Sequence, residues 1–309
     1  GLAPHSLRAV PPDSLKAAVA GLHAMLPQAP VHIHIAEQTQ EVDDCLAWSG
    51  QRPVQWLMEH APVDPRWCLI HATHMKPEEY ASAARSGAVA GICPTTEANL
   101  GDGIFDMPLW LQHGGRWGVG SDSHATVNAA EELLMLEYSQ RLHLRQRNVL
   151  GGGLQPQVAT SMTLQAVAGG AQASGRVTRG EVAGLVVGRQ ADFVVLDAEH
   201  VALAGLPADS AHASHVFASH RTSAIADVWV NGRLRVSQGE AGGDHDVGAV
   251  ALHRGDHLIG VSRCRGAGGD EQVAGLPDGV APVGRRAVQP DGLGDLTADG
   301  VHRVQGRGG

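Results

Sequence analysis

Three ionisable side chains stand near the ends of short hydrophobic runs in this sequence. In "VHIHIAEQ" (31–38), His34 comes late in the run and Glu37 follows three residues later. His71 closes "RWCLIH", and Asp122 closes "RWGVGSD". Imidazole and carboxylate groups are ligands for Zn²⁺ or Fe²⁺. A nearby carboxylate that does not bind the metal can move protons between water and a leaving group. The residue types therefore suit a catalytic metal site.

Each of these residues also has a simpler interpretation. His34 and His71 could be hydrogen-bonded histidines of a core, and Asp122 could cap the helix that follows it. Glu37 could be a first-turn glutamate, which the helix dipole favours. His32 points the same way as His34 because strand residues alternate, and we expect a structural role for it. From the residue pattern alone, both interpretations of the group stay open.

The elements around these residues alternate between strands and helices. Buried runs that alternate with amphipathic helices predict a parallel sheet, whose strand ends meet at one edge. The fold class is therefore α/β, as half of an eight-stranded barrel or as a small open sheet. The predicted helices cover 11–26, 41–61 (with a break at 50–53), 76–87, 107–114 and 129–148, and the predicted strands cover 31–35, 66–72, 88–94 and 116–122.

The second half of the chain changes character twice. After a helical segment within 151–180, short β-branched runs separated by glycine predict a small β-module, with Asn231–Gly232 as a hairpin turn. Residues 240–309 contain many glycines and no aromatic residue, so we expect them to be poorly ordered. The predicted domains are 1–179, 180–239 and 240–309.

Composition narrows the functional classes. The 309 residues include 43% hydrophobic and 18% charged residues, with a net charge of −9 and no basic stripe. We therefore expect a small-molecule substrate, no nucleic acid and no membrane as partners. The oligomeric state stays open, with a homodimer among the options. The four cysteines have no paired spacing, and cytoplasmic location is the default expectation.

Five segments together resemble the amidohydrolase superfamily. They are "HIHIAEQ", "LIHATHM", "CPTTEANLGDGIF", "GVGSDSH" and "EELLMLEYSQRL". The resemblance covers residues 1 to about 239 and is greatest to the formimidoylglutamate deiminases of bacterial histidine breakdown. It implies the C-terminal half of a TIM-type (β/α)8 barrel followed by a small β-sandwich. It also implies a zinc-dependent hydrolase, with Fe²⁺ as the other suitable metal, that converts N-formimidoyl-L-glutamate to N-formyl-L-glutamate and ammonia.

The resemblance also implies a role for each site residue. His34, on the fifth barrel strand, and Asp122, after the eighth, are metal ligands, and Asp122 also takes a proton from the attacking water. Glu37 is the proton shuttle, and His71, after the sixth strand, polarises the substrate. His5 and Arg8 lie in the loop of the fourth strand and hold the substrate, with Arg8 on a carboxylate of its glutamate portion.

One motif of the superfamily is missing. Its members carry a His-x-His pair on the first barrel strand, whereas the His-x-His here, His32 and His34, belongs to the fifth strand. We therefore expect this chain to be the C-terminal part of such an enzyme. Three alternatives remain: a deaminase acting on a guanine- or cytosine-like ring, an inactive barrel fragment that lacks the first-strand metal ligands, or a lobe that needs a partner chain.

Overall fold

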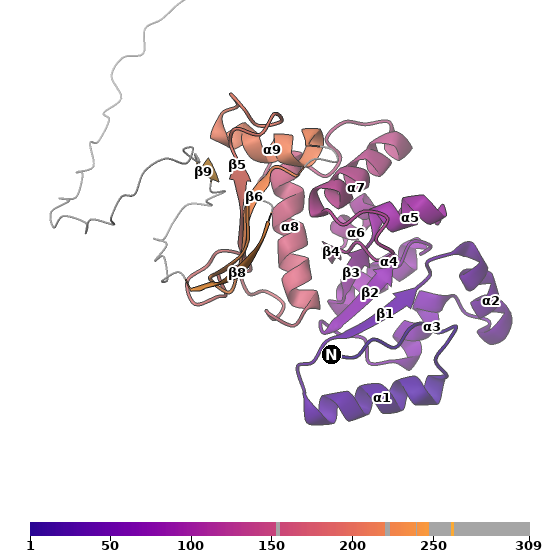
Figure 1. The fold of residues 1–309 in the computed structure, drawn as a ribbon. Coiled ribbons are helices and arrows are strands. Elements are labelled where there is room, and N and C mark those ends of the chain that lie inside the picture. The colour runs from indigo at the N-terminus through magenta and orange to yellow at the C-terminus, as the bar shows by residue number, and fades with distance from the viewer. Residues whose placement is uncertain (153–154, 220–222, 239, 247–260, 263–309) are drawn as a thin grey trace, which may run out of the picture. The chain divides into compact units, whose positions relative to one another are not determined.

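The computed structural model describes residues 1–152, 155–219, 223–238, 240–246 and 261–262 (Figure 1). The chain divides into two compact units, residues 1–265 and 266–309, and the second unit lies outside the described residues. In the part of the chain that is described, no helix is long and apolar enough to cross a membrane. The first unit contains two sheets with their helices.

Four parallel strands form the first sheet, in the order β1-β2-β3-β4. They are β1 (Val31–Ile35), β2 (Trp67–His71), β3 (Val89–Ile92) and β4 (Arg116–Val119). Each strand pairs in parallel with the next one along the chain. The predicted parallel sheet is confirmed, and every predicted strand of this part is present.

Eight helices accompany this sheet among the described residues. They are α1 (Pro12–Met25), α2 (Thr39–Ser49), α3 (Pro53–His60), α4 (Pro77–Ser86), α5 (Pro94–Leu100), α6 (Met107–Gln112), α7 (Ala129–Leu144) and α8 (Val158–Ala173). Local sequence sets many of their ends. Five of them carry proline in the first turn, where no helical N–H is lost. Gly50, Gly87 and Gly101 follow α2, α4 and α5 with positive φ.

One face of the sheet carries the main hydrophobic core. Val31, Ile33 and Ile35 of β1 are buried there with side chains of the surrounding helices, including Leu15 of α1 and Leu57 of α3. Alternate residues of a strand point to opposite faces, so His32 and His34 point to the second face. Strand β1 is therefore apolar on the face toward α1 and α3 and carries His32 and His34 on the other.

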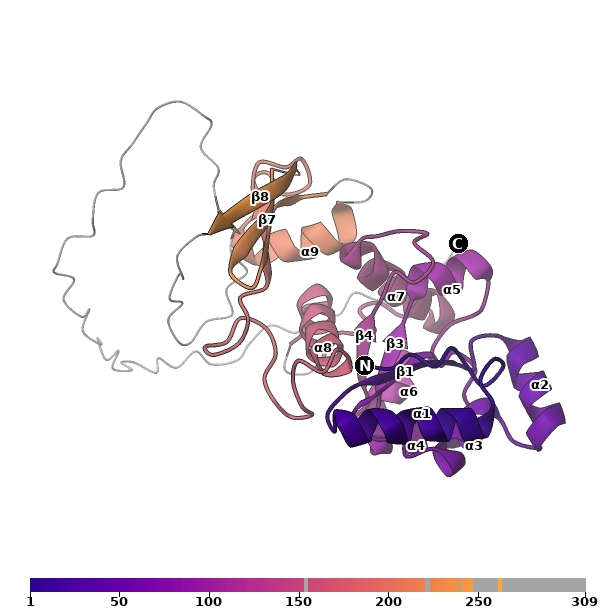
Figure 2. The same cartoon turned by 60° about the horizontal axis from the view of Figure 1, so that its bottom comes forward.

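Helix α8 covers part of the second face. The His32 ring donates a hydrogen bond from Nε2 to the carbonyl oxygen of Ala173, at 2.8 Å, and Ala173 packs with Cys68 of β2. The helix backbone approaches β4 so closely that a Cβ on Gly169 would lie 1.9 Å from the Trp117 carbonyl oxygen. Figures 1 and 2 show α8 beside the strands and away from α1, α3 and α4.

Residues 2–6 run along the free edge of β1. Leu2 bridges to Val31 and Ser6 bridges to His34, both in parallel. The His34 N–H donates to the His5 carbonyl oxygen at 3.0 Å. This edge segment lies where the fourth strand of the predicted barrel would lie. Among the described residues the sheet stays open, because β4 does not pair back to β1.

The second sheet has five strands in the order β8-β7-β6-β5-β9. They are β5 (Phe193–Asp197), β6 (Ile225–Val230), β7 (Arg233–Ser237), β8 (Glu240–Asp246) and β9 (Val261–Ser262). Neighbours are antiparallel except β5 and β9. Asn231 and Gly232 join β6 to β7 with φ of 53° and 70°, which fits the predicted hairpin turn.

Two expectations for this region are not confirmed and stay predictions. The described residues from 180 onward form one sheet and helix α9 (Ala208–Ala218), so the second sheet of a sandwich is not seen there. Strands β8 and β9 also lie in the segment that we expected to be poorly ordered. Strand pairing uses backbone N–H and C=O groups, which a glycine-rich segment has as well. The rest of the predicted tail lies outside the described residues.

Helix α9 contacts two helices of the first sheet. The rings of Tyr138 in α7 and Phe217 in α9 stack with centroids 5.9 Å apart. The Arg141 guanidinium carbon lies 5.5 Å from the first ring and 5.4 Å from the second. Thr163 of α8 and His212 of α9 share a hydrogen bond of 3.1 Å.

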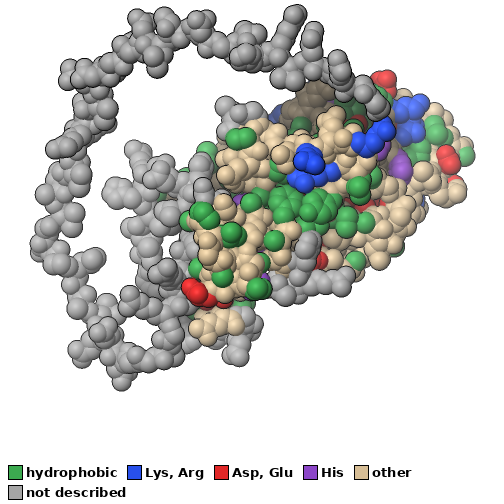
Figure 3. All heavy atoms as spheres, turned by 90° about the horizontal axis from the view of Figure 1, so that it is seen from above, with side chains coloured by type: hydrophobic (Ala, Val, Ile, Leu, Met, Phe, Trp, Pro, Cys, Tyr) green, Lys and Arg blue, Asp and Glu red, His purple; other side chains and the backbone are tan. Residues whose placement is uncertain are grey.

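A view from above shows hydrophobic side chains gathered beside Lys and Arg side chains (Figure 3).

Candidate active site

Four predicted site residues meet at the carboxyl ends of the parallel strands. The rings of His34 and His71 stack with centroids 5.6 Å apart. The Nε2 atom of His71 lies 3.5 Å from Glu37 Oε1 and 3.8 Å from Asp122 Oδ2. The strand-end argument predicted that these side chains converge, and they do form one cluster.

The backbone turns sharply where these residues follow their strands. Five residues here have positive φ without being glycine, a conformation that is uncommon for other residues, although Asn, Asp and His adopt it more often than the rest. They are Ala36 (49°), His71 (65°), Ala72 (49°), Asp122 (45°) and His124 (59°). Such residues tend to gather at functional sites, where the surrounding fold holds the strained backbone in place. Because the chain turns at Ala36, the side chains of His34 and Glu37 leave the backbone in different directions.

The edge segment fixes the ring of His34. Its Nδ1 lies 2.7 Å from the His5 carbonyl oxygen. A carbonyl oxygen only accepts, so Nδ1 carries the hydrogen and a neutral ring leaves the Nε2 lone pair free. The His5 ring lies beside it, with centroids 5.1 Å apart, and shares a hydrogen bond with Ser6.

Glu37 is held by its own loop. The backbone N–H groups of Ala36 and Glu37 both donate to the carboxylate of Glu41, at 3.0 and 2.9 Å. Glu41 is buried in the first turn of α2. The Glu37 side chain is thereby free to contact His71 through one oxygen and Arg8 through the other, at 3.0 Å.

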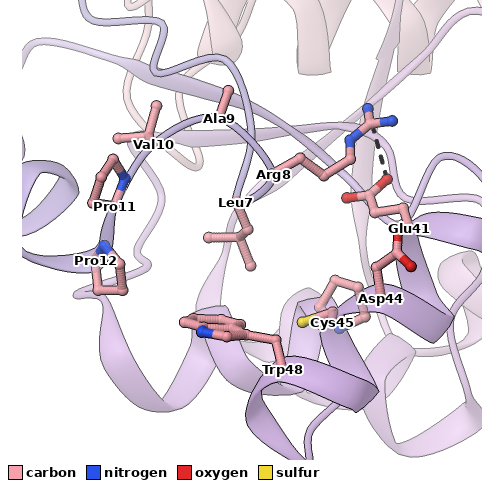
Figure 4. A pocket seen from close by; sticks show the side chains of 11 residues that line it. Leu7, Arg8, Ala9, Val10, Pro11, Pro12, Glu41, Asp44, Cys45 and Trp48 are labelled. Atoms are coloured by element: carbon pink, nitrogen blue, oxygen red, sulfur yellow. Dashed lines mark ion pairs between the residues drawn. The ribbon is translucent and has the colours of Figure 1, made fainter.

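Arg8 borders an open pocket between the edge segment and α2 (Figure 4). The pocket has a volume of about 380 Å³, and Leu7 faces Trp48 across it. Besides its contact with Glu37, the Arg8 guanidinium lies 3.9 Å from Glu41. A substrate carboxylate would have to compete with these two acids for Arg8.

The sequence analysis missed Glu97, which contacts His71 from α5. Glu97 Oε1 lies 3.2 Å from His71 Nδ1, and both side chains are buried. Burial alone would lower the pKa of His71, but the Glu97 hydrogen bond and the charges of Glu97, Glu37 and Asp122 together raise it. The available signal was the spacing of Cys93 and Glu97, one helical turn apart directly after a strand.

Comparison with known proteins identifies the family. The amidohydrolase family model matches residues 1–235. The chain belongs to the amidohydrolase family. It is 50% identical to formimidoylglutamate deiminase of Pseudomonas aeruginosa over 244 residues, covering 79% of this chain and 52% of that protein. It is 30% identical to a 5-methylthioadenosine/S-adenosylhomocysteine deaminase of Shouchella clausii, covering 75% of this chain and 51% of that protein.

A solved amidohydrolase has the same fold over the matched part. The amidohydrolase from Brucella melitensis superposes with a TM-score of 0.68 and 46% identity, covering 78% of this chain and 51% of that one. This chain thus spans about half the length of the relatives that it matches. Over the matched part, the α/β fold is that of an amidohydrolase.

The donor set of this site fits the metal that amidohydrolases imply. The Nε2 lone pair of His34 is free, and Asp122 offers a carboxylate about one-third exposed. A carbonyl partner on the other ring nitrogen is the usual support of a metal-binding histidine. A catalytic zinc takes three protein ligands, so His34 and Asp122 would need at least one more.

Another buried group of donors lies beside this pair. His71, Cys93 and Glu97 have potential ligand atoms within 4.8 Å of one another. Burial raises the pKa of the Cys93 thiol well above its usual range. Glu97 Oε1 already accepts from the Cys93 N–H at 2.8 Å. This group therefore suits hydrogen bonding better than metal binding.

Proposed function

We propose that this chain carries the fifth-to-eighth-strand part of a metal-dependent formimidoylglutamate deiminase. The observation that carries the proposal is that Glu37 and Asp122 both lie near Nε2 of His71. The free Nε2 of His34 lies beside this group. The 50% identity to a formimidoylglutamate deiminase favours this member of the family. The reaction adds water to the formimidoyl carbon of N-formimidoyl-L-glutamate and releases ammonia and N-formyl-L-glutamate.

Each residue has a step that its position allows. Zn²⁺ or Fe²⁺ held by His34 and Asp122 would supply Lewis acidity, which lowers the pKa of water toward ~7. Asp122 accepts one proton from the attacking water. Glu37 carries the other water proton to the departing nitrogen, and the proton on Asp122 follows it, so that ammonia leaves as the C–N bond breaks and the C=O bond forms. His71 Nε2 faces the same space, and when the ring is protonated its Nε2–H donates to the formimidoyl group and polarises it.

His5 and Arg8 are proposed to hold the glutamate portion. Arginine binds carboxylates through paired N–H donors, and Arg8 already lies among carboxylates. Its side chain is about one-third exposed, so a ligand can reach it. Arg8 lines the pocket and also contacts Glu37. The proposed carboxylate-binding residue is therefore next to the proposed proton shuttle.

A ring deaminase is the second candidate, because a deaminase of an adenosine-type substrate is 30% identical to this chain. The reacting ring of such a substrate carries no carboxylate for Arg8 to bind. The Arg8→Gln variant therefore separates the two. For formimidoylglutamate we expect KM to rise at least about tenfold with little change in kcat, as for lost ground-state binding.

Ammonia release tests the proposal. The full chain, loaded with zinc, is assayed with N-formimidoyl-L-glutamate and with 5-methylthioadenosine, and zinc per chain is measured after desalting. Ammonia from the first substrate alone supports the deiminase. Ammonia from the nucleoside alone replaces it with the ring deaminase. Bound zinc below one per chain with neither activity would instead support the inactive fragment that needs a partner chain.

A further inference from the structure

Glu97 links helix α5 to the ring of His71. Its Oε1 lies 3.2 Å from His71 Nδ1 and accepts the Cys93 N–H at 2.8 Å. Glu97 is only 4% exposed and His71 only 1%. Water therefore has little access to this contact, and Nδ1 of His71 depends on Glu97 for its hydrogen bond.

The chemistry of the two groups sets the tautomer. An ionised carboxylate only accepts hydrogen bonds, so Nδ1 of His71 must carry a hydrogen. The other nitrogen, Nε2, is then the one that lies near Glu37 and Asp122. A rotated ring, or the opposite tautomer, would leave the Glu97 oxygen without this donor and direct a different atom at the reaction centre.

We propose that Glu97 is a positioning residue, which holds the His71 ring with Nδ1–H toward α5 and Nε2 toward the reacting atoms. The inference rests on the proposed function only for the catalytic task of Nε2. The tautomer itself can be observed without substrate. Nothing in this assignment requires Glu97 to touch the substrate.

A purely structural role for Glu97 is the competing explanation, since it also caps the start of α5. Glu132 offers a matched comparison. It is equally buried and holds the same helix by accepting from the backbone and hydroxyl of Thr95. No hydrogen bond joins Glu132 to His71 among the described residues. Removing either carboxylate loosens α5, but only the loss of Glu97 releases the ring.

Nitrogen NMR of the full chain, labelled with ¹⁵N-histidine, reads the tautomer directly. The His71 signals are assigned by their loss in His71→Gln, and the pH is raised until the ring is neutral. We expect Nδ1 to keep its proton in the wild type and in Glu97→Gln, whose amide oxygen also accepts. Glu97→Leu should lose this preference, and Glu132→Leu should keep it.

Activity adds a second readout. We expect kcat to fall about 10- to 100-fold in Glu97→Leu with KM within about twofold, and to recover in part in Glu97→Gln. A proton on Nε2 of neutral wild-type His71 would overturn the inference, even if Glu97→Leu did not fold. An equal change in Glu132→Leu would also overturn it. If the tautomer is as expected but formimidoylglutamate is not hydrolysed, the proposed function fails and the positioning role stands.

Discussion

Glu37 joins a cation and a histidine through separate oxygens. Oε2 lies 3.0 Å from Arg8, and Oε1 lies 3.5 Å from His71 Nε2. Its side chain is largely buried, with 12% of its surface exposed to solvent. A carboxylate in this position can exchange protons with a bound molecule through one oxygen while Arg8 holds the other.

Replacing Glu37 by glutamine separates binding from proton transfer. We expect Glu37→Gln to lower kcat by about 10²- to 10⁴-fold with a small change in KM, because the amide keeps the shape but cannot carry the proton. Steady-state ammonia release measures both constants. Asp43→Asn, an exposed acid on α2, is the control and should stay within about twofold of the wild type. Near-normal turnover of Glu37→Gln would remove Glu37 from the mechanism.

The two histidines of β1 give a matched test of metal binding. His34 and His32 lie on the same face, but His32 Nε2 is used by the Ala173 carbonyl oxygen. We expect His34→Gln to reduce bound zinc by at least about tenfold, since it removes a ligand. His32→Gln should retain zinc and unfold at a lower temperature. Zinc per chain and thermal melting measure the two effects, and equal zinc loss in both variants would contradict the assignment of His34.

At the scale of elements, the contact of α8 with β4 depends on glycine, which has no side chain, at residue 169. Gly169 lies against the Trp117 backbone, and Gly118 of β4 lies against Gly170. A helix can come this near a strand only where both carry no bulk. This contact fixes how α8 lies over the second face of the sheet.

Neighbouring glycines of α8 should respond in opposite directions to alanine. We expect Gly169→Ala to lower the free energy of unfolding by about 1–3 kcal/mol, because the new Cβ meets the Trp117 carbonyl. Gly170→Ala should raise it by about 0.5–1 kcal/mol, since nothing lies within 4 Å and alanine favours a helix. Urea unfolding measures both, and a destabilised Gly170→Ala would contradict this packing.

The elements of the first sheet could be predicted because their signals are local. Buried runs, first-turn prolines and closing glycines mark β1 to β4 and most helices. Helix α5 was missed because "PTTEANL" has no apolar period, and buried hydrogen bonds to Glu97 and Glu132 stabilise it instead. Helix α9 was missed within a segment read as β-structure.

Long-range contacts mark the limit of prediction for the site. The strand-end pattern was enough to bring His34, His71 and Asp122 together, since parallel strands end at one edge. The partner of the other His71 nitrogen lies 26 residues away on a helix that was not predicted. The face that α8 covers depends on a contact between His32 and Ala173, 141 residues apart. No local pattern encodes either choice.

At the scale of the whole molecule, α9 connects the two sheets: it lies between β5 and β6 in the chain and packs against α7 and α8. The predicted boundary at residue 180 stays a prediction, because the compact unit runs from residue 1 to 265. The joint is made by the Tyr138–Phe217 stack and by His212 with Thr163. His212 is only 9% exposed, and its Nδ1 has no hydrogen-bond partner among the described residues.

Burial lowers the pKa of His212 below its ordinary value, which makes this joint sensitive to acid. The unfolded histidine takes up a proton near its ordinary pKa of ~6.5, whereas the folded one stays neutral to a lower pH. Its contribution to stability is therefore constant above about pH 6.5 and falls as the pH drops below it, by at most about 1.4 kcal/mol per pH unit.

Urea unfolding between about pH 5 and 7.5 tests this linkage. We expect His212→Gln to show a shallower loss of stability with acid than the wild type. His143→Gln, on the exposed side of α7, is the control. Equal slopes in the wild type and His212→Gln would show that other groups cause the acid sensitivity.

The contact between His32 and Ala173 has a consequence for how the chain folds as it is made. Strands β1 and β2 can pair as soon as residue 71 is available, but Ala173 comes about a hundred residues later. At roughly 5–20 residues per second, the 102 residues from His71 to Ala173 (173 − 71) take about 5–20 s to synthesise. Until then Ala173 does not cover Cys68 and Val89 on the second face. The nascent chain is therefore most open to aggregation or to a chaperone just before α8 emerges.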